Sequence, residues 1–249
     1  MSKNVLLIHG LRGDHHGLAE LAELLTQEGY NVENVDLPGS GERAELTKKN
    51  LDGYADWLHE YVADKNPYII AHSMGTIITS HYLRKYPTDQ VQRKVVFISP
   101  IFRTKSGQKT SNVLYALTTG AVKILPKRSR YKFLGSKAVS FCISHYLTTD
   151  KSQQKRIDKL HYLYSGRFAS ADSLLADMKI SMKEQTVLLE NKDVLYIIGN
   201  KDRLVKTKLA RARAAEQGAH YAEINKTGHL INYEQPAQLA AVIDEFIRA

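Results

Sequence analysis

The sequence predicts an α/β protein built on a doubly wound, parallel sheet. Three observations support this prediction: six short apolar runs recur along the chain, helical patterns alternate with them, and one long helical segment interrupts the rhythm. The apolar runs are continuous rather than alternating, which is typical of parallel strands covered by helices on both faces. The chain has 249 residues, enough for one large domain or for a core with an insertion.

The expected strands and helices alternate in chain order. Strands are expected at residues 4–9, 31–36, 67–71, 94–99, 194–199 and 219–224. Helices are expected at residues 16–28, 51–64, 75–86, 206–217 and 235–248. Such alternation implies right-handed crossovers, so the strands should lie parallel in one sheet.

The alternation stops between residues 101 and 190, where no convincing strand pattern occurs. The segment contains 16 Lys and Arg against 6 Asp and Glu, whereas the remainder contains 19 against 20. Its apolar residues recur at helical spacing: Val113, Leu114, Leu117, Ala121, Ile124, Leu125, Ile157, Leu160, Leu163 and Tyr164. We therefore expect a core of residues 1–100 and 191–249 and a helical lid at 101–190. Apolar faces of that lid should pack on the core or line a pocket.

Composition and the N-terminal segment predict a cytoplasmic protein. The apolar run at residues 5–8 is too short for a signal peptide, and no later run is long enough to span a membrane. Cys142 is the only cysteine, so no intramolecular disulfide is possible. Its neighbours Phe141 and Ile143 predict a buried position, which makes Cys142 a poor candidate for a catalytic thiol.

Polar residues follow several of the expected strands at the point where each strand ends. Ser73 follows the third strand, Asp202 the fifth and His229 the sixth. In an open parallel sheet these ends lie at one edge, where ligands collect. A serine, a carboxylate and a histidine in this chain order are typical of a nucleophile on a sharp strand-to-helix turn.

Each of these residues also has a purely structural interpretation. Ser73 is suited to cap a helix, Asp202 to cap a loop, and His229 to occupy a turn. The coincidence of all three at one sheet edge favours the catalytic interpretation. Asp36, an alternative acid, follows a strand on the wrong side of Ser73.

Five motifs carry a family resemblance: HGLRG near the start, DLPGSG after the second strand, AHSMG at Ser73, GNKD before the acid and TGHLINYEQP around the histidine. With these motifs the chain resembles lidded α/β-hydrolases of the monoacylglycerol-lipase or small-esterase type. The resemblance covers about 160 core residues, and the insertion lies where that family has its lid. The family usually has two further N-terminal strands and a glycine in place of Ala71. Starting at the family's third strand leaves a six-stranded parallel sheet.

The resemblance implies a role for each site residue. Ser73 is the nucleophile, His229 the general base and acid, and Asp202 the group that holds the imidazole tautomer. Backbone N–H groups of Leu11 and Met74 form the oxyanion hole. Further candidates for substrate contact are Arg12, His72 and Leu117.

The expected ligand is a small-molecule ester with a short- to medium-chain acyl group, with no cofactor and no metal. His15 and His16 are adjacent, so they do not form an i, i+4 metal pair. The basic lid suggests an anionic or membrane-surface substrate. A nucleic-acid partner is not expected, because the densest basic cluster contains one aromatic residue and matches no nucleic-acid motif; its members are Lys127, Arg128, Arg130, Tyr131 and Lys132.

Three other functions remain open. A thioesterase would use the same triad. A lyase of the menaquinone-pathway type would bind an anionic substrate through cap arginines. One or two of Arg103, Arg128, Arg130 and Arg167 should then point towards Ser73. A non-enzymatic ligand-binding protein would not depend on Ser73.

Overall fold

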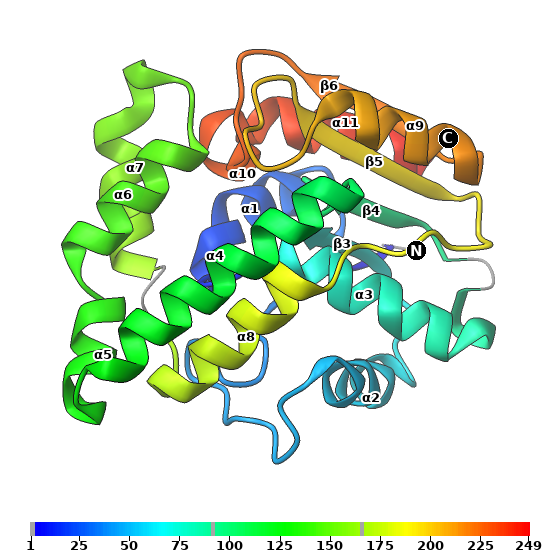
Figure 1. The fold of residues 1–249 in the computed structure, drawn as a ribbon. Coiled ribbons are helices and arrows are strands. Elements are labelled where there is room, and N and C mark those ends of the chain that lie inside the picture. Colours follow the sequence, from blue (N-terminus) through cyan, green and yellow to red (C-terminus); the bar gives the residue numbers. More distant parts are fainter. Residues whose placement is uncertain (1–2, 91–92, 165–166) are drawn as a thin grey trace.

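A computed structural model describes residues 3–90, 93–164 and 167–249 (Figure 1). Six strands form one sheet in the order β2-β1-β3-β4-β5-β6, and every neighbouring pair is parallel. The strands are β1 (Asn4–Ile8), β2 (Asn31–Val35), β3 (Tyr68–His72), β4 (Val95–Ile98), β5 (Val194–Gly199) and β6 (His220–Ile224). The predicted sheet is confirmed.

Helices cover both faces of the sheet because its central strands are apolar on both sides. On one face α1 (Ala19–Gln27) and α11 (Pro236–Arg248) pack against the inner strands. On the other face lie α2 (Leu51–Val62), α3 (Met74–Lys85) and α9 (Thr207–Gln217). These five helices agree with the predicted ranges within two residues at each end, with one exception. The exception is the start of the first, where a short 3-10 turn (His15–Leu18) precedes α1.

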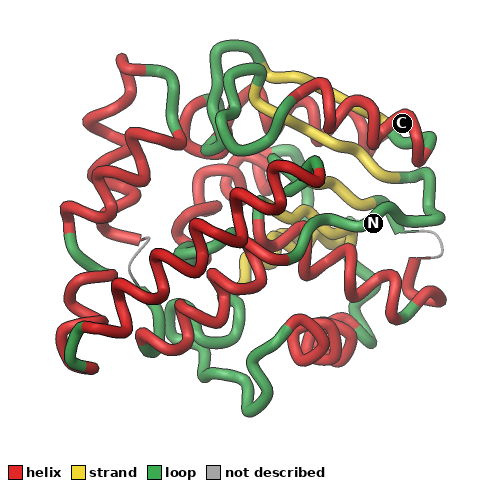
Figure 2. The backbone as a smooth tube through the Cα atoms, in the orientation of Figure 1, coloured by secondary structure: helices red, strands yellow, loops and turns green. Residues whose placement is uncertain are grey.

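Five helices lie between β4 and β5, in the segment of residues 101–190 that we call the insertion (Figure 2). They are α4 (Lys105–Ile124), α5 (Lys127–Leu134), α6 (Lys137–Leu147), α7 (Gln154–Tyr164) and α8 (Ala171–Lys183). α4 packs on α8 and α6 packs on α7, while α8 also contacts α3 of the core. Within the described ranges, no helix of the chain is both long and apolar enough to cross a bilayer.

The insertion returns to the core along the loop that follows β2. Ser40 and Phe168 form an isolated antiparallel bridge. The Gly41 N–H donates to the Arg167 carbonyl at 2.7 Å, and the Ala169 N–H donates to the Gly39 carbonyl at 3.0 Å. These backbone bonds join the segment just before α8 of the insertion to the core.

Two expectations about the insertion are wrong. Much of the apolar stripe of α4 faces outward: Leu117 is 67% exposed and Ile124 is 86% exposed. The helix packs instead through the opposite side, where Thr119 and Val122 are buried. Cys142, predicted to be buried, is exposed on α6, because its two apolar neighbours indicate hydrophobicity without fixing which side of the helix faces the core.

Candidate active site

Ser73 lies on a strained turn between β3 and α3. Its backbone has φ 51° and ψ −117°, a conformation that non-glycine residues rarely adopt. The chain is tightly packed there: a Cβ added at Gly75 would lie 2.7 Å from the His9 carbonyl oxygen and 2.8 Å from that of Ile8. The Ser73 side chain makes no capping bond to α3, so the structural interpretation of this serine as a helix cap is wrong.

The Ser73 hydroxyl faces His229 instead. His229 Nε2 lies 2.8 Å from Ser73 Oγ, and His229 Nδ1 lies 2.8 Å from Asp202 Oδ2. With the Nδ1 proton donated to the carboxylate, Nε2 is left to accept the hydroxyl proton. The structure therefore brings together the three side chains that the sequence placed at one sheet edge.

Asp202 bonds to the loop with one oxygen and to the imidazole with the other. Its Oδ1 accepts the backbone N–H groups of Leu204 and Val205 at 2.8 and 3.0 Å. Burial acts to raise the pKa of Asp202, but the neighbouring His229 and the N–H donors outweigh it, so the pKa lies below its usual value. Asp202 is thus ionised at neutral pH.

The His229 loop is held by contacts that the sequence did not reveal. The His229 N–H donates to the carbonyl of Leu147 in α6 at 2.7 Å. The His229 carbonyl accepts from Ser99 Oγ at 3.0 Å, and His72 Nε2 lies 3.1 Å from the same oxygen. Burial, followed by the charge of His229, lowers the pKa of His72 to about 3. His72, a candidate substrate contact, is therefore neutral, lines the cavity, and also supports the His229 backbone.

The loop after β1 passes directly over Ser73. A Cβ added at Gly10 would lie 3.0 Å from Ser73 Cβ and 3.1 Å from His72 Nδ1, so a larger residue would have to displace these neighbours. His9 anchors the loop: its Nε2 accepts the Leu37 N–H at 2.9 Å, which leaves Nδ1 to donate to the Gly10 carbonyl at 2.8 Å. Leu11 follows on this loop, while Met74 is the first residue of α3, where N–H groups lack partners in a preceding turn.

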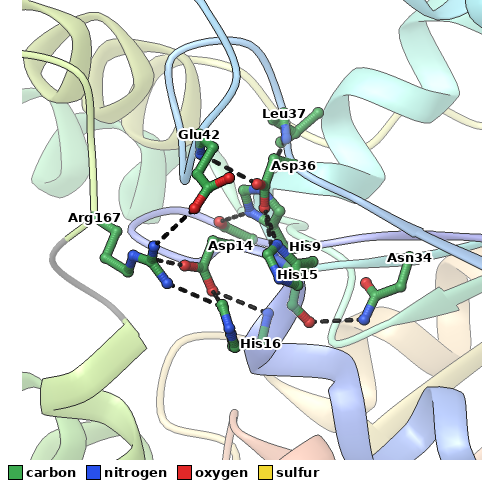
Figure 3. A network of polar contacts seen from close by, with 10 residues as sticks. His9, Asp14, His15, His16, Asn34, Asp36, Leu37, Glu42 and Arg167 are labelled. Atoms are coloured by element: carbon green, nitrogen blue, oxygen red, sulfur yellow. Dashed lines mark hydrogen bonds and ion pairs between the residues drawn. The ribbon is translucent and has the colours of Figure 1, made fainter.

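A polar network fixes the same loop from the outside (Figure 3). Asp14 is fully buried and accepts the His16 N–H at 3.0 Å. Arg167, from the insertion, lies with Nε 3.6 Å from Asp14 Oδ2 and with Nη2 3.6 Å from Glu42. Asp36 accepts the His15 N–H at 2.7 Å. Asp36 thus bonds to His15, whereas His229 bonds to Asp202. Among the described residues, no group of His, Cys, Asp and Glu is arranged to hold a metal ion.

A cavity of about 690 Å³ lies above Ser73 and His229. Its walls come from both core and insertion and are mostly apolar; they include Phe102, Leu114, Tyr146, Met178, Met182 and Leu230. Leu117, expected to contact substrate, does not line the cavity. It lies nearly one turn beyond Leu114 on α4 and points outward, so that expectation is wrong.

Three arginines line the cavity: Arg12, Arg103 and Arg203. Arg12 Nη1 donates to the carbonyl of Leu134 in the insertion at 2.8 Å, while its buried Nε and Nη2 have no hydrogen-bond partner. Burial lowers the pKa of Arg12 to about 10. Arg103 donates through Nη1 to the Glu184 carbonyl at 2.6 Å and through Nη2 to the Ser181 carbonyl.

The other three members of the expected cap-arginine set do not line this cavity. Arg128 and Arg130 line a separate hollow beside Tyr131. Arg130 also donates to the carbonyls of Leu125 and Lys123. Arg167 pairs with the carboxylates of the loop network. Arg103 is therefore the one residue of the expected cap-arginine set that reaches the cavity.

Comparison with known proteins agrees with this architecture. No curated protein matches the chain. Among solved structures, it is similar to a thermophilic esterase from Thermogutta terrifontis (18% identity, TM-score 0.73, covering 100% of this chain and 90% of that one). It is also similar to the esterase EaEST from Exiguobacterium antarcticum (16% identity, TM-score 0.71, covering 100% of this chain and 92% of that one). A third similar structure is MenH from S. aureus (16% identity, TM-score 0.70, covering 99% of this chain and 93% of that one). The model of the alpha/beta hydrolase family matches residues 5–242. The chain therefore belongs to the alpha/beta hydrolase family.

Proposed function

We propose that the protein is a serine hydrolase that cleaves carboxylic esters through an acyl-enzyme on Ser73. The observation that carries the proposal is the continuous hydrogen-bonded chain from Ser73 through His229 to Asp202 at the floor of an apolar cavity. The two esterases of the same fold are consistent with it. We also propose that the insertion acts as a lid domain over this cavity.

The residues suit acyl transfer in two steps. His229 takes the Ser73 proton as Oγ attacks the carbonyl carbon, and the Leu11 and Met74 N–H groups face the resulting oxyanion. His229 then gives the proton to the departing alcohol, which leaves the acyl group on Ser73. A water molecule, deprotonated by His229, attacks the acyl group and releases the acid, and Ser73 regains its proton. This sequence requires no cofactor.

Covalent labelling tests the nucleophile directly. We expect a fluorophosphonate to modify Ser73 in the folded protein, because the hydroxyl is activated by His229 at 2.8 Å. Peptide mapping by mass spectrometry identifies the modified residue, and Ser73→Ala should abolish labelling. Ser99→Ala is the matched control, since Ser99 Oγ bonds the His229 carbonyl and not the reacting nitrogen. Absence of label on Ser73 in folded protein would remove the acyl-enzyme proposal.

The cavity predicts a preference among acyl chains. Each methylene buried against its apolar wall favours binding by about 0.8 kcal/mol, or about fourfold. For neutral nitrophenyl esters we expect kcat/KM to rise from acetyl to medium-chain acyl groups and to fall again when the cavity is full. A flat profile from acetyl to dodecanoyl, no higher than that of Ser73→Ala, contradicts both the acyl pocket and the esterase activity.

A lyase reaction on an anionic substrate is the second candidate. It is favoured by Arg12, whose buried Nε and Nη2 lack partners beside the cavity, and by the common fold with MenH. A thioesterase would use the same triad and differs only in the leaving group. Parallel assays with oxygen esters, thioesters and carboxylate-bearing substrates separate the three, and a ligand-binding protein without activity would be inert in all of them.

A further inference from the structure

The insertion exposes an unusual number of large apolar side chains. Across the described residues nine are exposed, and eight of them belong to the insertion: Val113, Leu114, Leu117, Ile124, Tyr131, Phe133, Phe141 and Tyr146. On α4, Val113, Leu117 and Ile124 are separated by four and seven residues, so they share one helix face. An exposed apolar helix face of this kind is typical of an interaction site.

This apolar surface borders the mouth of the cavity above Ser73. Leu114 of α4 and Tyr146 of α6 are half exposed and also line the cavity. Leu204, the ninth exposed apolar residue, lines the cavity from the core side. Leu114 and Tyr146 therefore join the exposed apolar residues of α4 and α6 to the cavity above Ser73.

The charge around the same surface has one sign. Residues 101–149 contain nine Lys and Arg and no Asp or Glu. Lys109 lies one turn before Val113, and Lys123 precedes Ile124. Both are exposed, as are Lys127 and Arg128. Within the described part of the chain, none of these four cations pairs with a carboxylate.

We propose that this surface docks on anionic lipid bilayers, with the cavity mouth turned towards the membrane. We call it the basic rim and define it by Val113, Leu114, Leu117, Ile124, Phe141, Tyr146, Lys109, Lys123, Lys127 and Arg128. Apolar side chains flanked by lysines are what an interfacial helix uses: the apolar face enters the headgroup region while the cations attract anionic lipid. A symmetric contact between two copies would bring two basic rims together, and their like charges would repel. A nucleic acid would pair its phosphates with the cations but would leave the apolar side chains of α4 exposed to water. Docking does not depend on the ester chemistry.

Vesicle sedimentation tests the proposal. We expect the full-length protein to bind phosphatidylcholine vesicles containing about one-third phosphatidylglycerol, and to bind pure phosphatidylcholine at least about tenfold more weakly. Val113→Asp with Ile124→Asp should reduce the vesicle partition coefficient at least about tenfold. Lys109→Glu with Lys123→Glu should abolish the preference for anionic vesicles, and added salt should have the same effect on the wild type.

Matched controls separate docking from folding and catalysis. Lys192→Glu with Lys208→Glu changes the net charge equally at exposed core positions away from the rim, and should leave vesicle binding unchanged. All variants should retain the wild-type melting temperature and fluorophosphonate labelling. If the wild type is not labelled, the proposed ester hydrolysis fails, but the docking proposal is unaffected. Wild type that stays in solution with anionic vesicles overturns the proposal, as does equal binding by the rim and control variants. Concentration-dependent dimerisation abolished by the rim variants, without vesicle binding, overturns it in favour of a second copy.

Discussion

Asp202→Asn is expected to lower kcat about 10⁴-fold with little change in KM, as loss of the orienting carboxylate does in serine proteases. An asparagine side chain has one acceptor oxygen, whereas Asp202 uses one oxygen for His229 Nδ1 and the other for the Leu204 and Val205 N–H groups. If the amide oxygen faces the loop, the amide NH₂ faces the imidazole and selects the tautomer that cannot accept the Ser73 proton. If the amide oxygen faces the imidazole instead, the Leu204 and Val205 N–H groups face the amide NH₂, which is itself a donor.

Steady-state kinetics on a neutral nitrophenyl ester measure this effect. Asp193→Asn is a suitable control, because Asp193 is exposed before β5 and makes no contact with His229. The variant should still fold, although with a loss of about 1–3 kcal/mol when a buried donor is left unpaired. A kcat within tenfold of wild type would show that Asp202 is not the orienting group.

Gly75→Ala is expected to destabilise the fold by about 2–4 kcal/mol and to remove most activity. The new Cβ would lie 2.7 Å from the His9 carbonyl oxygen and 2.8 Å from that of Ile8. Both are backbone atoms of β1 or the loop after it, so relief requires α3 to move away from that loop. That movement would displace Ser73 and Met74 from the positions that acyl transfer needs.

Urea unfolding and ester kinetics together test the prediction. Gly120→Ala is the matched control, since Gly120 lies inside α4 and an added Cβ would meet nothing within 4 Å. Alanine is the better helix former, so this control should gain about 0.5–1 kcal/mol. Equal stability of the two variants would mean that the close approach at Gly75 does not constrain the fold.

The sheet and the position of the candidate site were predictable because both depend on local pattern. Four strands are buried without alternation, and this marks a sheet covered on both sides. Because all six strands run the same way, residues that follow them must gather at one edge. Ser73, Asp202 and His229 could therefore be grouped without knowledge of any contact.

Other features depend on contacts between segments far apart in the sequence. The hydrogen bonds from the His229 N–H to the Leu147 carbonyl and from Arg12 to the Leu134 carbonyl join the core to the insertion. No periodicity in the sequence predicts them. The errors at Leu117 and Cys142 have a different cause. A helical repeat defines an apolar face, but only tertiary packing determines whether that face meets the core or the solvent.

The backbone bridge between Ser40 and Phe168 has a consequence for recombination between relatives. Residues 39–41 and 167–169 are joined main chain to main chain, so their conformations depend on each other whatever their side chains. A chimaera that exchanges residues 101–190 alone would break this junction, even if the chain is well connected before residue 101 and after residue 190. Transferring the insertion to a relative therefore requires transferring the loop after β2 as well. The unit that must be exchanged consists of two separate stretches of sequence.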